Sequence, residues 1–353
     1  MKKLLLKRMN RIIGLFSLNH LLVFGMSLLL SLLFTPYARK IFLKKRNTTK
    51  YNSRTIHNKV ITSAGGISIY VSFLITMVVI LLLGKGWMAE TFSSSFLKIM
   101  LSGTAMFILG LYDDFKHLSA HKKLIFQILV ALFLVIIGVK IELGWLGIPL
   151  TIFWIVYVTN AINMIDGLDG LATGIVTFAS LFLSLTMLST GNIALTFFYL
   201  CLCGSALGFL KYNFYPAKIF MGNSGSHFLG FMISAASVYA SQKTSFTNAF
   251  IIPIIVLGIP LIDPLSVVIH RLIIHSGIFT ADRSHIHHRL LNLGFSQRNT
   301  VLLLYAGAIL LGVLVFCGLV IKDFLSIFLF IVALSFTIFI LFPNLKQKQE
   351  NFK

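Results

Sequence analysis

Long apolar segments, separated by short polar ones, follow one another along almost the whole chain. An α-helix needs about 20 apolar residues to cross a lipid bilayer, and most of these segments approach or reach that length. The pattern predicts membrane-spanning helices near residues 14–34, 64–83, 96–112, 124–140, 148–162, 171–188, 193–210, 227–241, 249–270, 300–320 and 324–342. The third and eighth segments are short, so we expect an all-α integral membrane protein with 10 or 11 transmembrane helices.

The composition supports this fold class. Of the 353 residues, 57% are hydrophobic and only 11% are charged, whereas a soluble domain carries about 25% charged residues. The polar segments are too short to hold a separate soluble domain, so residues 1–353 are predicted to form one membrane domain. Cys201, Cys203 and Cys317 fall inside apolar segments, which favours buried apolar thiols over a disulfide framework or a zinc site.

The distribution of basic residues predicts which loops face the cytoplasm. Alternate loops carry 20 of the 30 Lys and Arg residues: 35–63, 113–123, 163–170, 211–226, 271–299 and the tail after 343. The positive-inside rule places these loops in the cytoplasm. The basic first eleven residues then fall outside, which fits the rule badly, and they are interpreted as an interfacial segment before an uncleaved first helix. No soluble basic module is present to bind nucleic acid.

Acidic residues are scarce and concentrated on the same side. Five of the ten lie in the loops assigned to the cytoplasm: Asp113, Asp114, Asp166, Asp169 and Asp282. A carboxylate at a helix centre in the membrane costs about 2.5–3.5 kcal/mol, so acids at a membrane boundary tend to mark function. The sequence therefore predicts a site built from cytoplasmic loops.

The first candidate group is Asp113 and Asp114, which end the third apolar segment. Adjacent carboxylates repel each other, and the helix dipole disfavours them at a C-terminal end. They therefore need a divalent cation or a neighbouring lysine, of which Lys116, Lys122 and Lys123 are available. This pattern indicates metal binding or proton abstraction; a solvated helix terminus is the alternative.

The second candidate group is the segment NAINMIDGLDGLATG, residues 160–174. Asn160, Asn163, Asp166 and Asp169 recur every three residues, so they share a face of a continuing helix or a shallow spiral. The glycines between them allow phosphate oxygens to approach the backbone closely. The segment is predicted to form one side of a site for a metal and phosphates; a helix exit capped by Asn and Asp is the alternative.

Two further groups carry anion-binding chemistry. The turn FMGNSGS, residues 220–226, offers backbone N–H groups to an anion. The segment DRSHIHHRL, residues 282–290, packs three histidines and two arginines together, which predicts a clamp for phosphate or pyrophosphate. A zinc site formed by His285, His287 and His288 is an alternative that the flanking arginines disfavour, and a merely basic loop is another.

Two smaller features remain open. Arg54 and His57 lie in the basic first loop, where they either contact lipid headgroups or substrate phosphate, or only anchor the loop on the cytoplasmic side. Asp263 lies between Pro260 and Pro264. Asp followed by Pro is typical of a helix start, so Asp263 is expected to be the N-cap where a broken helix restarts.

The four motifs YDDFKHLSAHKK, NAINMIDGLDGLATG, FMGNSGS and DRSHIHHRL occur in an order and spacing that resembles the polyprenyl-phosphate N-acetylhexosamine-1-phosphate transferases, glycosyltransferase family 4. The resemblance covers residues 54–290. The pattern His-Ile-His-His looks like the branch that uses N-acetylglucosamine 1-phosphate to begin O-antigen, enterobacterial common antigen or teichoic acid synthesis. The peptidoglycan branch, which transfers phospho-N-acetylmuramoyl-pentapeptide, usually has three consecutive histidines there.

The resemblance implies transfer of a sugar 1-phosphate from a UDP-sugar to undecaprenyl phosphate, with release of UMP. It implies Mg²⁺, with Mn²⁺ as an alternative ion, in a multi-pass protein of the bacterial cytoplasmic membrane. The catalytic acids would be Asp113, Asp114, Asp166 and Asp169. The residues expected to bind substrate are Lys123, Asn160, His285, His287, His288 and Arg289. The metal ligands would be Asn163, Asn223 and Asp114. A homodimer is left open.

One departure from the family pattern is important. The family usually has Gly-Asp-x-Gly with Asp as the principal metal ligand, whereas this chain has Gly222-Asn223-Ser224-Gly225. An amide lacks the negative charge that Mg²⁺ prefers, so weaker metal binding is expected. A catalytically impaired binder of lipid phosphate or nucleotide sugar is therefore an alternative. A transporter, suggested by the broken helices, is disfavoured because the motif acids lie at one membrane face.

Overall fold

The structure is a computed structural model that describes residues 14, 17–44, 61–83, 94–245, 247–273 and 285–321. Every regular element in these ranges is a helix, which confirms the all-α prediction. The main helices are α2 (Leu18–Lys44), α3 (Gly65–Leu83), α5 (Ser94–Lys116), α6 (Ala120–Ile136), α7 (Gly147–Ile165), α8 (Leu171–Thr190), α9 (Ile193–Asn213), α10 (Gly222–Ser241), α11 (Ile252–Val256), α12 (Gly258–Ile273), α13 (Ile286–Asn292) and α14 (Gln297–Ile321). Short helical turns at Gly144–Leu146 and Thr247–Ile251 precede α7 and α11.

Seven helices in the described part of the chain are long and apolar enough to cross a membrane, and α11 with α12 forms a bent pair with a 76° break that counts as an eighth. The multi-pass prediction is thus confirmed. The fourth and eighth predicted segments correspond to α6 and α10, which are helical but are not among these spans. The segment 324–342 lies outside the described residues, so the number eleven stays a prediction.

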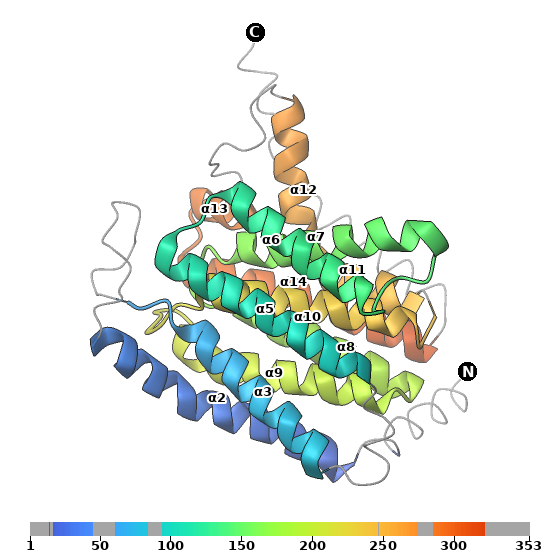
Figure 1. Cartoon of the computed structure of the whole chain (residues 1–353). Helices are drawn as coiled ribbons and strands as arrows, with labels where there is room; N and C mark the ends of the chain where they lie inside the picture. Colours follow the sequence, from blue (N-terminus) through green and yellow to red (C-terminus); the bar gives the residue numbers. More distant parts are fainter. Residues whose placement is uncertain are drawn as a thin grey trace.

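The central helix of the bundle is α10. All its residues from Ser224 to Ala240 are buried, and it packs against α5, α7 and α3 (Figure 1). A second layer is formed by α2, α8 and α9, with α14 against α8. Because α10 meets protein on every side, it can carry small and polar residues that lipid would not tolerate. This explains why its apolar signal in the sequence is short.

The start of α10 is held by very close backbone contacts. Gly65 and Gly66 in the first turn of α3 donate backbone hydrogen bonds of 2.9 and 2.8 Å to the carbonyl groups of Phe220 and Met221. On the other side, a Cβ added to Gly110 of α5 would lie 2.4 Å from the carbonyl oxygen of Asn223. Glycine at these positions lets three helices meet closely, and it places the FMGNSGS turn beside the end of α5.

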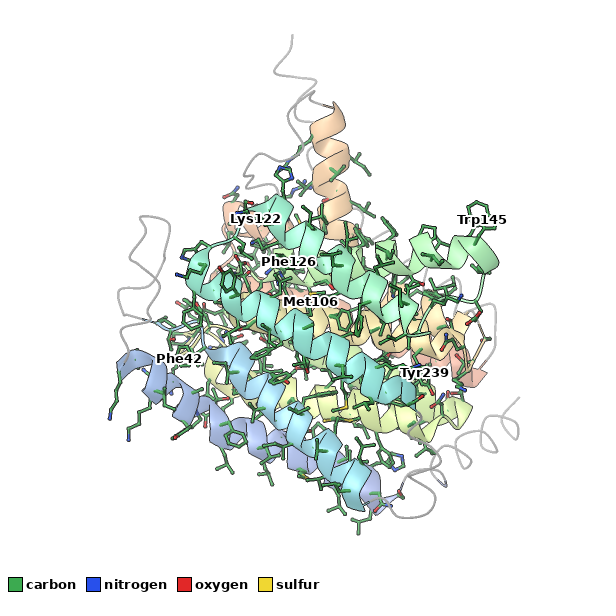
Figure 2. The ribbon with its side chains drawn as sticks, in the orientation of Figure 1. Phe42, Met106, Lys122, Phe126, Trp145 and Tyr239 are labelled. Atoms are coloured by element: carbon green, nitrogen blue, oxygen red, sulfur yellow. The ribbon has the colours of Figure 1, made fainter. Side chains whose placement is uncertain are left out.

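Three of the loops that were assigned to one membrane side, residues 113–123, 163–170 and 211–226, lie at one end of the bundle. In Figure 2, Phe42 and Lys122 mark this end, and Trp145 and Tyr239 mark the opposite one. The first end collects the C-terminal ends of α5 and α7 and the N-terminal ends of α6, α8 and α10. For these three loops, the grouping predicted from the charge pattern is the observed one. Loops 35–63 and 271–299 and the tail after 343 lie partly or wholly outside the described residues, so their placement stays a prediction.

The prediction for Asp263 is wrong. Asp263 and Pro264 both lie inside α12, which begins at Gly258. The helix restarts five residues earlier than the Asp-Pro pair suggests, because the bend falls between Val256 and Gly258. Pro264 is the seventh residue of α12, so it lacks the N–H that would otherwise bond to the carbonyl of Pro260, and the helix continues through it.

We expect Gly110→Ala to destabilise the protein. The added methyl group would collide with the backbone of Asn223 and Ser224, which cannot move aside like a flexible side chain, and overpacking of this kind costs about 1–3 kcal/mol. The measurement is the apparent melting temperature in detergent. Gly25→Ala is the matched control, since nothing lies within 4 Å of a Cβ at Gly25. Equal melting temperatures for both variants would contradict the close approach.

Candidate active site

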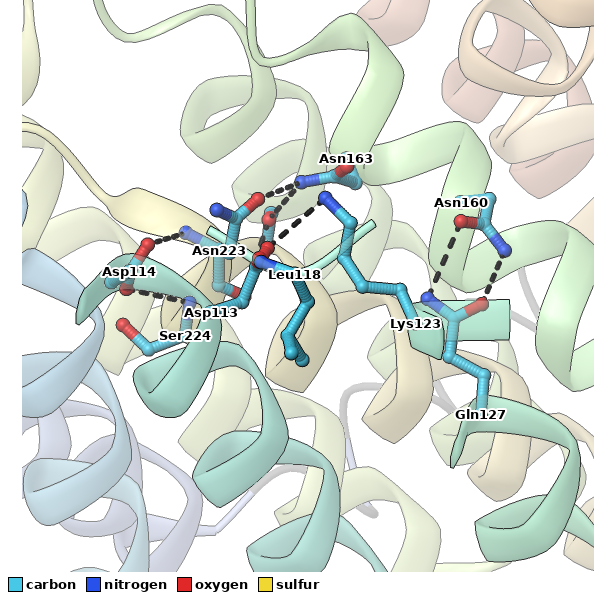
Figure 3. Close-up of polar contacts among 10 residues, drawn as sticks. Asp113, Asp114, Leu118, Lys123, Gln127, Asn160, Asn163, Asn223 and Ser224 are labelled. Atoms are coloured by element: carbon cyan, nitrogen blue, oxygen red, sulfur yellow. Dashed lines mark hydrogen bonds and ion pairs between the residues drawn. The ribbon is translucent and has the colours of Figure 1, made fainter. Parts of the chain in front are cut away.

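The carboxylate of Asp114 connects α5 to α10. One oxygen accepts the backbone N–H of Asn223 at 2.7 Å, and the other accepts that of Ser224 at 3.0 Å (Figure 3). A carboxylate is a favourable partner for the N–H groups that open a helix. Gly222 adopts a φ of 74°, and a Cβ there would lie 2.7 Å from the Asp114 carboxylate. Asp114 thus fixes the FMGNSGS turn at the site.

Asp113 is buried, with 1% of its surface exposed. One carboxylate oxygen accepts the backbone N–H of Leu118 at 2.7 Å, and the other lies 3.0 Å from Nζ of Lys123. Lys123 is therefore the counter-charge, whereas Lys116 and Lys122 are exposed. The result is a lysine held in a defined position at the start of α6, with its ammonium group beside a buried acid (Figure 3).

Asn163 and Asn223, the two predicted amide ligands, are in direct contact. Nδ2 of Asn163 donates to Oδ1 of Asn223 at 3.0 Å and to Oγ of Ser226 at 2.8 Å (Figure 3). Within the described part of the chain, the side-chain amide oxygen of Asn163, Oδ1, receives no hydrogen bond. Carboxylate and amide oxygens are the donors that a hard cation prefers. The site therefore has the donor chemistry for Mg²⁺.

Asn160 faces a different neighbour. It exchanges two hydrogen bonds with the side chain of Gln127 on α6, of 2.6 and 3.3 Å, and its amide also donates to the carbonyl of Val156. Gln127 is fully buried. The polar atoms of Asn160 thus join α6 to α7, and its predicted role in substrate binding stays a prediction.

Asp166 and Asp169 flank the turn between α7 and α8. Asp169 is buried and accepts the backbone N–H of Ala217 at 2.9 Å, which holds the segment that leads into α10. No described group donates a hydrogen bond to Asp166. Withdrawal from water, together with the carboxylates of Asp114 and Asp169, raises the pKa of Asp166 well above its usual range. Asp166 therefore lies where a cation would be favourable.

The histidine cluster of α13 lies against the same turn. His287 is buried, and a Cβ added to Gly167 would lie 2.4 Å from its Nε2. Burial and the neighbouring His288 lower the pKa of His287 to about 4, so this ring is neutral at physiological pH. Arg289 belongs to the same short helix. Asp282, Arg283, Arg54 and His57 lie outside the described residues, so their predicted roles stay predictions.

A zinc site finds no support in the described residues. In residues 14, 17–44, 61–83, 94–245, 247–273 and 285–321, no group of three or more His, Cys, Asp and Glu side chains is placed to hold a metal ion. One of the three histidines, His285, is instead paired with a carboxylate, since its Nδ1 lies 2.8 Å from Asp263. The thiols of Cys201 and Cys203 are free and buried, as predicted.

Two site residues were not predicted as such. These residues are Asp263, which pairs with His285, and His227. His227 is 1% exposed and lies one helical turn after Asn223. Its Nδ1 has no hydrogen-bond partner in the described part of the chain, and its ring interacts electrostatically with Asp113 and Lys123. The four-residue spacing from Asn223 places both on one helix face and is a signal that the sequence already contains.

We expect Asp166→Asn to leave the protein as stable as the original chain or to make it more stable. Because the folded state raises the pKa of Asp166, stability falls as the pH rises from the ordinary carboxyl pKa through the raised one, and an uncharged amide avoids that loss. The measurement is the melting temperature with a metal chelator across pH 5–9, where the advantage of Asn should grow with pH.

Asp114→Asn is the matched comparison. The N–H groups of Asn223 and Ser224 bind different oxygens of Asp114. In Asn one of these oxygens is replaced by an NH2 group, which faces an N–H donor and leaves it unpaired, at a cost of about 1–3 kcal/mol. This variant should melt at a lower temperature. If Asp166→Asn lowered the melting temperature, Asp166 would not be an unfavourable carboxylate in the folded state. If Asp114→Asn left the melting temperature unchanged, Asp114 would not hold the start of α10.

A family model and several known proteins resemble this chain. A family model described as Glycosyl transferase family 4 matches residues 96–241. The chain is 38% identical over 294 residues, 80% of each chain, to a probable undecaprenyl-phosphate N-acetylglucosaminyl 1-phosphate transferase of Bacillus subtilis (strain 168). It is 32% identical over 319 residues, 75% of this chain and 80% of the relative, to a decaprenyl-phosphate N-acetylglucosaminephosphotransferase of Mycobacterium leprae. It is also 30% identical over 317 residues, 82% of this chain and 94% of the relative, to a phospho-N-acetylmuramoyl-pentapeptide-transferase of Bacillus mycoides. Similarity that extends over most of the chain, and not only over the motifs that meet at the end of the bundle, establishes that this protein belongs to glycosyl transferase family 4.

Proposed function

We propose that this protein transfers an N-acetylhexosamine 1-phosphate, specifically N-acetylglucosamine 1-phosphate, from a UDP-sugar to undecaprenyl phosphate and releases UMP. The reaction would take place at the cytoplasmic face of the bacterial membrane, as the first membrane step in making a surface polysaccharide. The observation that carries the proposal is that the Asp113–Lys123 pair, the Asn163–Asn223 pair and the histidines of α13 lie at one end of the bundle. The name of the Bacillus subtilis relative supports N-acetylglucosaminyl 1-phosphate as the transferred group and undecaprenyl phosphate as the acceptor.

The charges of the substrates explain what this arrangement has to do. A lipid phosphate and a nucleotide diphosphate are both polyanions, so they repel each other until positive charge is placed between them. Catalysis of phosphoryl transfer depends mainly on positioning and on stabilising charge at the transferring group. Lys123 supplies one fixed positive charge, because Asp113 holds its ammonium group at 3.0 Å.

The preferred mechanism is direct attack by the lipid phosphate. An oxygen of the lipid phosphate forms a bond to the phosphorus that carries the sugar, and the bond from that phosphorus to the oxygen shared with UMP breaks. A phosphate monoester has a second pKa near 6, so much of the acceptor is already deprotonated at neutral pH. Asp113 takes the proton from the remainder, and its second contribution is to hold Lys123 beside the acceptor phosphate.

Magnesium is the proposed cofactor. Mg²⁺ is usually bound by one or two carboxylates together with substrate phosphates, and it keeps several waters. Asp166 and the carbonyl oxygen of Asn163 are the described donors best placed to serve it, since Asp114 already accepts two backbone hydrogen bonds. When bound, the ion would neutralise charge on the phosphates of the nucleotide sugar.

Asn223→Asp should strengthen the dependence on magnesium. Aspartate can accept the same hydrogen bond from Asn163, so the fold is preserved while a negative charge is added to the site. The magnesium concentration for half-maximal transfer should fall several-fold, measured with purified protein in detergent. Asn192→Asp is the matched control, because Asn192 caps α9 through Leu195 and Asp is an equally good N-cap. An unchanged magnesium dependence in Asn223→Asp would show that residue 223 does not act through the metal.

The decisive experiment supplies purified protein with undecaprenyl phosphate, magnesium and one UDP-sugar at a time. The expected result is UMP and a lipid-linked N-acetylglucosamine phosphate from UDP-N-acetylglucosamine. Product only from UDP-N-acetylmuramoyl-pentapeptide would favour the other branch, for which the 30% identical Bacillus mycoides relative is the supporting observation. No product from any UDP-hexosamine would favour a non-catalytic binder, as the neutral Asn223 suggests.

A second measurement separates the two mechanisms. If the lipid phosphate attacks directly, labelled UMP should not enter UDP-N-acetylglucosamine when the lipid acceptor is absent. Exchange without the acceptor would instead indicate a covalent phospho-enzyme, in which an aspartate of the site first takes the sugar phosphate. If Asp113 acts as a base, no exchange is therefore expected. If Asp113 acts as a nucleophile, exchange is expected in the same experiment.

A further inference from the structure

Asp263 is a fully buried carboxylate whose two oxygens both reach α13. One oxygen lies 2.8 Å from Nδ1 of His285, and the other accepts the backbone N–H of Ile286 at 2.7 Å. The exposed fractions of the two side chains are 13% for His285 and 0% for Asp263. A buried carboxylate is costly unless it is paired and hydrogen-bonded. This one is paired across 22 residues of sequence, so it links two elements that are not neighbours in the chain.

The geometry fixes the hydrogen positions of the His285 ring. An ionised carboxylate can only accept hydrogen bonds, so Nδ1 of His285 must carry a hydrogen atom and donate it. The edge of the ring that holds Nδ1 faces Asp263, so Nε2 on the opposite edge is the ring nitrogen that is left for a ligand. A carboxylate that orients a histidine in this way determines what the other ring nitrogen offers to a ligand.

The His285 ring also belongs to the site through its neighbours. It is stacked on the ring of His287, with centroids 5.7 Å apart and planes 8° apart. His287 in turn contacts Gly167 in the turn that carries Asp166. On the other side, the hydroxyl of Tyr157 on α7 donates to the carbonyl of Leu261 in the first turn of α12. Asp263 is thus held in place from α7, the helix that also presents Asn163.

We propose that Asp263 is a positioning residue: it holds His285 so that Nε2 faces the diphosphate of the nucleotide-sugar donor. This inference rests on the function proposed above. It gives a function to a carboxylate that is not among the predicted catalytic acids. It also accounts for two contacts at once, since the cap on Ile286 fixes the backbone of α13 while the bond to Nδ1 fixes the ring.

Asp263→Asn separates the two contacts. The amide oxygen can still accept the N–H of Ile286, but the amide group then presents hydrogen atoms to Nδ1 of His285, which is the reverse of the original pattern. We expect kcat/KM for UDP-N-acetylglucosamine to fall about tenfold to a hundredfold, as for other groups that orient a binding histidine. The KM for undecaprenyl phosphate should stay within about twofold, because the acceptor is assigned to Asp113 and Lys123.

A double-mutant cycle with His285→Ala tests whether Asp263 acts through the ring. If it does, Asp263→Asn should cause almost no further loss of kcat/KM in the His285→Ala background. A merely structural role would cause the same fold-loss in both backgrounds and would change both substrates alike, and this result would overturn the proposal. Ser266→Ala is the matched control: it removes a buried hydrogen bond to the backbone carbonyl of Asp263 on the same helix and leaves the carboxylate intact.

Binding measurements keep the inference distinct from the proposed function. If the original chain transfers no sugar phosphate, the proposed function fails, and the shift in melting temperature caused by UDP-N-acetylglucosamine still tests Asp263. A shift that is present in the original chain and in Ser266→Ala but lost in Asp263→Asn supports the positioning role. A shift that is equal in all three proteins, or that is absent from the original chain, overturns it.

Discussion

Two backbone N–H groups at the start of α10 share the carboxylate of Asp114, and the rest of the site depends on this contact. It sets the first turn of α10 against the end of α5, where Gly110 allows the backbones to touch. Asn223 is then within reach of Asn163, and Asp113, the residue before Asp114 in α5, pairs with Lys123. Asp114 therefore fixes the backbone of α10 while Asp113 holds Lys123, so the two adjacent aspartates have different contacts.

The remaining acids are explained by their partners. Asp113 is neutralised by Lys123, Asp169 holds the backbone of Ala217, and Asp263 holds His285 and Ile286. Asp166 alone among these carboxylates has neither an ion pair nor a hydrogen-bond donor among the described residues, and withdrawal from water, together with the nearby acids, raises its pKa. A carboxylate in this state is unfavourable for folding and favourable for binding a cation. A positive ligand bound at Asp166 would recover the free energy that the fold loses there.

The sequence predicted most of this arrangement because the membrane restricts the choices. Long apolar segments in a membrane favour helices, and the loop charges correctly grouped residues 113–123, 163–170 and 211–226 at one end of the bundle. The sequence did not predict which partner each polar side chain contacts. Asn160 and Asn163 are three residues apart, which turns one about 60° from the other on a helix, so Asn160 meets Gln127 while Asn163 meets α10. Asp263 was interpreted from its neighbour Pro264, whereas its partner is 22 residues away; such pairing leaves no local pattern.

The neutral Asn223 determines how the site must balance charge. Nδ2 of Asn163 donates to Oδ1 of Asn223, and both side chains are uncharged amides, so this pair contributes oxygen atoms without negative charge. A divalent cation held there depends on Asp166 and on the phosphates of the substrate for its charge balance. It follows that metal and nucleotide sugar should bind together, each weakly alone, because each supplies the charge that the other lacks. His227, buried one turn below Asn223 and close to Asp113 and Lys123, adds a neutral polar group to this region, which keeps the site polar without adding the carboxylate that the family pattern would place at position 223.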